Sequence, residues 1–247
     1  YWMIDLVSLA DKYEVRSFCN EDPSQFLRWY SLSKKADVET ASFITAMLSF
    51  GSRPQFISKV KYILETADKT SGSITAWIKQ DAPGFPKGSR KFYRFYSYDD
   101  LRALFCGLKN ILFCSVNEKP ETLGNYFKNI YAKTKEPLYK IICQSFPDVK
   151  IVPKGKNSAN KRIHMFLRWM VRTESPVDLG IWKWYPKSEL IIPLDVHVMQ
   201  ESVKMGLLPQ DSKADFKTAI KLTQKMKEYF PGDPCRADFA LFGVGVN

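Results

Sequence analysis

The stretch KRIHMFLRWMVR, residues 161–172, has the apolar spacing of a helix that packs into a protein core. Its large apolar side chains recur at intervals of three and four residues and so share one side of an α-helix: Ile163, Phe166, Leu167 and Met170. Ser158 lies just upstream, and we expect it to be the N-cap. This start places Lys161 in the first turn.

A lysine in the first turn of a helix requires an explanation. The unpaired amides at a helix N-terminus carry partial positive charge, which disfavours a second cation there. Two interpretations of Lys161 remain open. It is either an ordinary solvated side chain, or an amine that loses its proton and acts as a nucleophile.

A second stretch of mixed character is IIPLDVHVMQ, residues 191–200, in which Asp195 interrupts an apolar run. Asp195 precedes a helical pattern, so it is predicted to be an N-cap, or else a carboxylate that takes part in chemistry. His197, one of two histidines in the chain, follows two residues later.

Helical spacing recurs over most of the chain, and strand signals are scarce. Helices are expected within 1–15, 38–50 (Asp37 as N-cap), from Pro54, from Tyr98 (Ser97 or Asp99 as N-cap), and within 120–147, 195–208 and 214–230. A terminal helix is expected after PGDP and ends with FGVGV, residues 242–246. Residues 182–193, WKWYPKSELIIP, are the one extended segment rich in β-formers. The sequence therefore predicts an all-α fold with a minor strand element, in two helical lobes: 37–172, and 1–36 plus 173–247.

Composition narrows the classes of partner. The chain has 37 Lys and Arg against 26 Asp and Glu, a formal charge of +11, which favours polyanions: nucleic acid first, anionic membrane second. Five cysteines without a CxxC pair argue against zinc or iron–sulfur ligation and for reduced thiols in the cytoplasm. No apolar run is long enough for a membrane span, and the first residues lack a signal-peptide pattern. We expect a cytoplasmic monomer without metal or cofactor.

The two mixed stretches together resemble a known family. PLDVHV (193–198) is similar to the aspartate segment of 8-oxoguanine glycosylases, and KRIHMFLRW (161–169) is similar to their lysine-bearing helix. The chain thus resembles the helix-hairpin-helix (HhH-GPD) DNA glycosylase superfamily, in a bacterial branch similar to 8-oxoguanine glycosylase/AP lyases. The resemblance implies that these two stretches face each other across one cleft. It also implies that Lys161 is the nucleophile, that Asp195 is the assisting carboxylate, and that His197 lies near the DNA backbone.

The resemblance extends to both sides of these stretches. Residues 45–64 are similar to the family's helix–loop–helix that probes the duplex, and residues 233–245 to its closing helix. DNA contacts are therefore expected at Ser52, Arg53, Gln55, Lys154, Lys156 and Arg162. Two aromatic side chains between the lysine and aspartate segments, Trp182 and Trp184, either stack on an extruded base or pack in the protein.

The implied function is a base-excision repair glycosylase, with or without AP lyase activity, that removes a damaged base such as an oxidised purine. Its partner would be double-stranded DNA in the nucleoid. One alternative is a DNA-binding module on the same fold without turnover, because the loop before Lys161 has only Gly155 where the family hairpin reads Pro-Gly-x-Gly. A helical protein-interaction domain is the other. Lys213, Lys217, Lys221 and Lys225 form an i,i+4 stripe that is either solvated or contacts phosphates.

Overall fold

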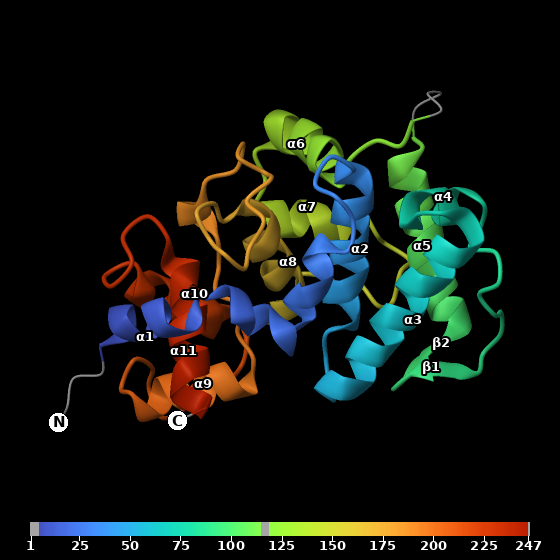
Figure 1. Ribbon diagram of the computed structural model, residues 1–247. Helices are drawn as coiled ribbons and strands as arrows, with labels where there is room; N and C mark the ends of the chain where they lie inside the picture. Colours follow the sequence, from blue (N-terminus) through green and yellow to red (C-terminus); the bar gives the residue numbers. More distant parts are fainter. Residues whose placement is uncertain (1–4, 115–118, 247) are drawn as a thin grey trace. The chain divides into compact units, whose positions relative to one another are not determined.

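The computed structural model describes residues 5–114 and 119–246, so the first four residues of the expected helical pattern at 1–15 lie outside it. The described chain is mostly helical and has one small antiparallel hairpin (Figure 1). The all-α class with a minor strand element is therefore confirmed.

The chain folds into two compact units. Unit 1 combines Tyr1–Ser24 with Gly155–Asn247, and unit 2 is Gln25–Lys154. These boundaries differ from those of the lobes expected at 37–172 and at 1–36 plus 173–247. The difference matters because the helix of Lys161 belongs to the same unit as Asp195.

Unit 2 is built around α2 (Lys35–Leu48), whose residues from Asp37 to Leu48 are all buried. Around it lie α3 (Arg53–Ser71), α4 (Ile74–Lys79), α5 (Tyr98–Leu112), α6 (Leu123–Thr134) and α7 (Leu138–Gln144). Two buried acids of α2 accept backbone N–H groups at the starts of neighbouring helices: Asp37 from Thr75 at 3.0 Å, and Glu39 from Gly124 at 2.9 Å. Helix starts have unpaired amides, so these acids fix α4 and α6 on α2.

The strand element lies in unit 2, not at residues 182–193. Strands β1 (Lys91–Tyr93) and β2 (Tyr96–Ser97) pair antiparallel in the segment KFYRFYS, and they turn the chain into α5 (Figure 1). The ring of Phe92 packs at 5.4 Å from Phe85 and 5.2 Å from Tyr98, measured between centroids. The hairpin thus contributes aromatic side chains to the core of unit 2.

Unit 1 contains α1 (Leu6–Tyr13), α8 (Lys161–Val171), α9 (Val196–Lys204), α10 (Phe216–Met226) and α11 (Ala237–Val246), with the short 3-10 helices η1 (Arg16–Asn20), η3 (Lys187–Glu189) and η4 (Pro234–Arg236). The 3-10 helix η2 (Pro23–Arg28) crosses the boundary between the units. Helix α1 packs along α11, where the ring centroids of Tyr13 and Phe242 are 5.9 Å apart. Phe18 adds edge-to-face contacts with Phe239 and Phe242. The two ends of the chain therefore share one core.

Residues 182–193 fold onto α8 instead of forming a strand. The N–H of Leu179 donates to the carbonyl of Trp169, and the N–H of Trp182 donates to that of Met170, both at 2.8 Å. These carbonyls belong to the last turn of α8, which has no partners for them within the helix. The expected strand was wrong because the segment satisfies a helix end and then enters η3.

The predicted helix caps had mixed outcomes. Asp195 caps α9 and Ser97 caps α5, as expected. Asp37 instead lies in the first turn of α2, and α8 begins at Lys161, with Asn160 and not Ser158 at the N-cap position. Ser158 forms an isolated antiparallel bridge with Asp215, so the chain is still extended at this point and the helix begins later.

Candidate functional site

Lys161 is the first residue of α8. Asn160, which precedes it with φ of 50°, makes no side-chain hydrogen bond to the helix, so the first amides of α8 have no capping side chain from that residue. The ammonium group therefore lies where the helix already presents partial positive charge. Such a position requires a negative partner.

Asp195 supplies the negative charge, although it is 34 residues away in the sequence. The ammonium of Lys161 donates to Oδ2 of Asp195 at 2.6 Å. The other carboxylate oxygen, Oδ1, accepts the N–H of Val198 at 2.8 Å and caps α9. Asp195 therefore acts as a helix cap and as the partner of Lys161 at the same time.

The Lys161–Asp195 pair is accessible to solvent. The lysine side chain is 38% exposed and the aspartate side chain is 30% exposed. Burial acts to raise the pKa of Asp195, but the Lys161 ammonium and the Val198 amide outweigh it, so this pKa lies below its ordinary value. The carboxylate is consequently ionised at neutral pH and can stabilise a cation that approaches from solvent.

Two arginines continue the charged side of α8 into the interior of unit 1. Arg168 and Arg172 follow Lys161 by seven and eleven residues, which is close to two and three helical turns. The guanidinium of Arg168 pairs with Asp178 at 3.2 Å and also with Asp238. Burial raises the pKa of Asp238, and the charges of Arg168 and Lys161 oppose that rise. Asp178 and Asp238 thus balance the positive charge of the buried Arg168 guanidinium.

Arg172 is 2% exposed and is surrounded by acids. Its guanidinium donates hydrogen bonds to both oxygens of Asp233 at 2.8 and 2.9 Å and to Asp178 at 2.5 Å, and it forms an ion pair with Glu14 at 2.9 Å. Glu14 in turn pairs with Arg236 at 2.9 Å. Buried charges are tolerated when they are paired in this way. One clue to this network is present in the sequence, a pair of arginines four residues apart in the otherwise apolar stretch 165–172, and sequence reasoning missed it.

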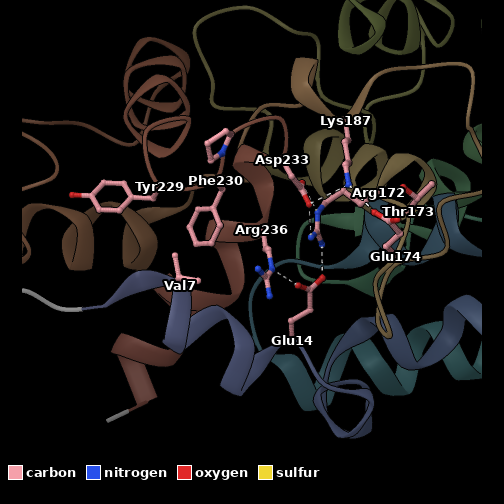
Figure 2. A pocket seen from close by; sticks show the side chains of 11 residues that line it. Val7, Glu14, Arg172, Thr173, Glu174, Lys187, Tyr229, Phe230, Asp233 and Arg236 are labelled. Carbon is pink, nitrogen blue, oxygen red and sulfur yellow. Dashed lines mark hydrogen bonds and ion pairs between the residues drawn. The ribbon is translucent and has the colours of Figure 1, made fainter.

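A pocket of about 390 Å³ opens beside this network (Figure 2). Arg172, Arg236 and Lys187 line it together with three acids that pair with them, Glu14, Asp233 and Glu174. An apolar part of its wall is formed by Val7, Tyr229, Phe230 and Pro231. Because the cations are already paired with these acids, the pocket gives no net charge to select a ligand. We therefore place the candidate site at Lys161 and Asp195.

The residues expected to contact DNA fall in both units. His197 is exposed on the first turn of α9, close in sequence to Asp195, and Lys156 and Arg162 flank Lys161 in unit 1. Ser52, Arg53 and Gln55 lie at the start of α3 in unit 2. The ammonium of Lys154 donates to the carbonyls of Phe146 and Val149 at 2.7 and 2.9 Å, so it holds the adjoining loop of unit 2.

Trp182 is 1% exposed and belongs to the core of unit 1. Its ring lies 5.3 Å from that of Phe166 of α8, edge to face, and 5.8 Å from that of Trp184, stacked. Stacking on an extruded base would require Trp182 to leave the core, so its burial favours packing, one of the two roles expected for this side chain. Trp184 is partly exposed and covers Trp182.

Comparisons with known proteins give a family but no function. Neither the curated proteins nor the solved structures include a match to this chain. Within residues 5–114 and 119–246, no cluster of three or more His, Cys, Asp or Glu could hold a metal ion, and no helix is long and apolar enough to cross a membrane. The family model described as protein of unknown function (DUF2400) matches residues 22–247, and the chain therefore belongs to that family.

Proposed function

We propose that this protein is a base-excision DNA glycosylase in which Lys161 is the nucleophile and Asp195 the assisting carboxylate. The observation that carries the proposal is the 2.6 Å contact between their side chains, at the starts of two helices and accessible to solvent. An amine beside an ionised carboxylate is the arrangement that this chemistry needs. The formal charge of +11 suits a polyanionic substrate.

The reaction would begin with a target nucleotide turned out of the duplex, at a cost of a few kcal/mol. The C1′–N bond breaks, its electron pair leaves with the base, and the base takes up a proton. The amine of Lys161, having given its proton to the leaving base or to solvent, forms a new bond to C1′. Opening of the sugar ring then yields an imine, from which β-elimination of the 3′ phosphate would cut the strand.

Asp195 has two tasks in this scheme. In the free protein its negative charge holds the Lys161 ammonium at the start of α8. When positive charge develops on the sugar, the same carboxylate faces the sugar and stabilises the transition state. The bond from the Val198 amide fixes the carboxylate in place, so it does not need to reorganise during the reaction.

Reduction with borohydride tests the proposal, because it converts the imine into a stable amine that links protein to DNA. Wild-type protein should give a covalent adduct with a duplex that contains an abasic site, and Lys161→Gln should give none. The matched control is Lys204→Gln, which removes an exposed lysine of α9 that pairs with Glu201 and should trap like wild type. An undiminished adduct with Lys161→Gln would refute the assignment.

A second candidate is a DNA-binding module without turnover on the same fold. It is favoured by the loop before Lys161, which has Gly155 as its one glycine and whose Lys154 bonds to carbonyls of its own unit. Tight, salt-dependent binding of duplex DNA without any trapped adduct would support this candidate. Absence of DNA binding at low salt would favour a protein-interaction domain instead.

A further inference from the structure

Helix α10 is attached to both segments of the proposed site. The N–H of Phe216, at its start, donates to the carbonyl of Asn157 at 3.0 Å, and Ser158 forms an antiparallel bridge with Asp215. Further along α10, the hydroxyl of Thr223 accepts the N–H of Ile192 at 3.0 Å. The helix is therefore fixed to the chain just before Lys161 and just before Asp195.

One face of α10 is buried and the other is basic. Its buried residues are Thr218, Ala219, Leu222, Thr223 and Met226. Lys217 and Lys221 lie on the opposite face and are exposed. Lys213, three residues before the helix begins, is exposed as well. Lys225 differs from these three because it pairs with Glu228 at 2.7 Å.

The antiparallel bridge extends this basic face toward Lys161. In an antiparallel pair, residues that precede one partner lie beside residues that follow the other. Lys156 lies two residues before Ser158, and Lys213 lies two residues before Asp215, so the bridge brings the segments that carry these two lysines together just before the start of α8. Lys156, Lys213, Lys217 and Lys221 form what we call the α10 lysine surface.

Charges in the α10 lysine surface are poorly balanced. Within the part of the chain that the structure describes, Lys213, Lys217 and Lys221 make no salt bridge. The one acid among them is Asp215, whose carboxylate accepts the N–H of Thr218 at 2.8 Å as the cap of α10. Like charges at i,i+4 repel one another and destabilise an isolated helix, so an unbalanced row of lysines needs a reason beyond folding.

We infer that the α10 lysine surface binds the phosphate backbone of duplex DNA next to the Lys161–Asp195 site. This inference rests on the proposed function and adds to it the contacts that hold the substrate, in place of a glycine-rich hairpin. The spacing of the lysines along α10 is comparable to that of phosphates along DNA, since four residues of α-helix advance about 6 Å. One strand of B-DNA advances about 3.4 Å per phosphate, so Lys217 and Lys221 span roughly two phosphates.

The test is the salt dependence of duplex binding. The triple variant Lys213→Gln, Lys217→Gln, Lys221→Gln should lower the slope of log K against log salt by about 2.7, because each lost phosphate contact removes about 0.9. Between about 50 and about 200 mM salt, wild type would then lose about 40-fold more affinity than the variant. The exposed side chains should leave the thermal unfolding midpoint nearly unchanged.

A matched variant controls for bulk charge. Lys128→Gln, Lys133→Gln, Lys140→Gln removes the same three charges from exposed positions on α6 and α7 of unit 2. Its slope should stay close to that of wild type. An equal fall in both triple variants, or no fall in the first, would overturn the inference.

Other outcomes distinguish DNA binding by the α10 lysine surface from the proposed glycosylase reaction. A lower slope in the α10 variant together with no trapped adduct in wild type would support the surface and reject the glycosylase. Failure of wild type to bind duplex DNA at low salt would reject both. If the α10 variant lost binding to phosphatidylserine vesicles but kept the wild-type slope on DNA, the surface would belong to a membrane partner and the inference would be wrong.

Discussion

Asp195→Asn and Asp195→Ala separate the two roles of this side chain. Asparagine keeps an oxygen that can accept the Val198 N–H, and asparagine caps helices about as well as aspartate does. It removes the negative charge that Lys161 contacts at 2.6 Å. Alanine removes both the cap and the charge.

The expected losses of stability follow from these contacts. The Lys161–Asp195 pair is about one-third exposed on each side, so its loss costs about 0.5 to 1 kcal/mol. Leaving the ammonium unpaired at the start of α8 adds a few tenths. Asp195→Asn should therefore lower the free energy of unfolding by about 1 kcal/mol. Asp195→Ala also loses an N-cap, worth about 1 kcal/mol, and should cost about 2 kcal/mol in all.

Urea unfolding measures these losses, and borohydride trapping on abasic duplex DNA measures the chemistry. Both variants should trap about 10² to 10³ times more slowly than wild type, since either one removes the charge that stabilises the transition state. Asp5, which caps α1 by accepting the N–H groups of Val7 and Ser8, is the matched control. Its Asn form should be more stable than its Ala form, and neither should alter trapping.

Two results would refute this reasoning about Asp195. Equal stability of the Asn and Ala variants would show that the cap contributes nothing. Trapping by Asp195→Asn at the wild-type rate would show that the negative charge has no part in the reaction, whatever the stability of the variant.

Three further predictions concern the framework of unit 1. Burial lowers the pKa of His164 to about 3, so below pH 6.5 the unfolded chain binds a proton that the folded chain does not. Stability should therefore fall with decreasing pH by up to about 1.4 kcal/mol per unit, and His164→Phe should flatten this slope between pH 7 and 5 in urea titrations; an unchanged slope would contradict the shift. Asp178→Asn, which leaves two buried arginines short of a carboxylate, should cost about 3 to 5 kcal/mol in the same assay, and a cost below 1 kcal/mol would contradict the network. Gly180→Ala should lower the free energy of unfolding by more than about 2 kcal/mol, because φ is +59° and a Cβ would lie 2.7 Å from the carbonyl oxygen of Arg172. Gly206→Ala, where φ is +71° and the space is open, should lower it by only about 1 kcal/mol. Equal losses in the two variants would argue against a clash at Gly180.

Much of the helical fold follows from local sequence signals. Apolar spacing predicts α8 and α10, and capping residues locate the starts of α5 at Ser97 and α9 at Asp195. The hairpin at 91–97 was not predicted because strands of three and two residues are too short to show alternation. Conversely, β-formers at 182–193 suggested a strand, but here they pack on α8, as Trp182 does.

The candidate site is harder to predict from local sequence patterns than the helices are. Spacing alone does not bring Lys161 to Asp195 across 34 residues, and the expectation came from a family resemblance. The start of α8 depends on the bridge between Ser158 and Asp215, which no local pattern reveals. The partners of Arg168 and Arg172 come from several distant segments, so the sequence indicates only that such arginines need partners.

The identity of the residue that carries the sugar after borohydride reduction is the most direct test of the account. Wild-type protein would be trapped on abasic duplex DNA, digested with protease and nuclease, and sequenced by mass spectrometry. If Lys161 is the nucleophile, the reduced sugar adduct will be found on Lys161. An adduct on another lysine, or on an amino terminus, with Lys161 unmodified, would contradict it.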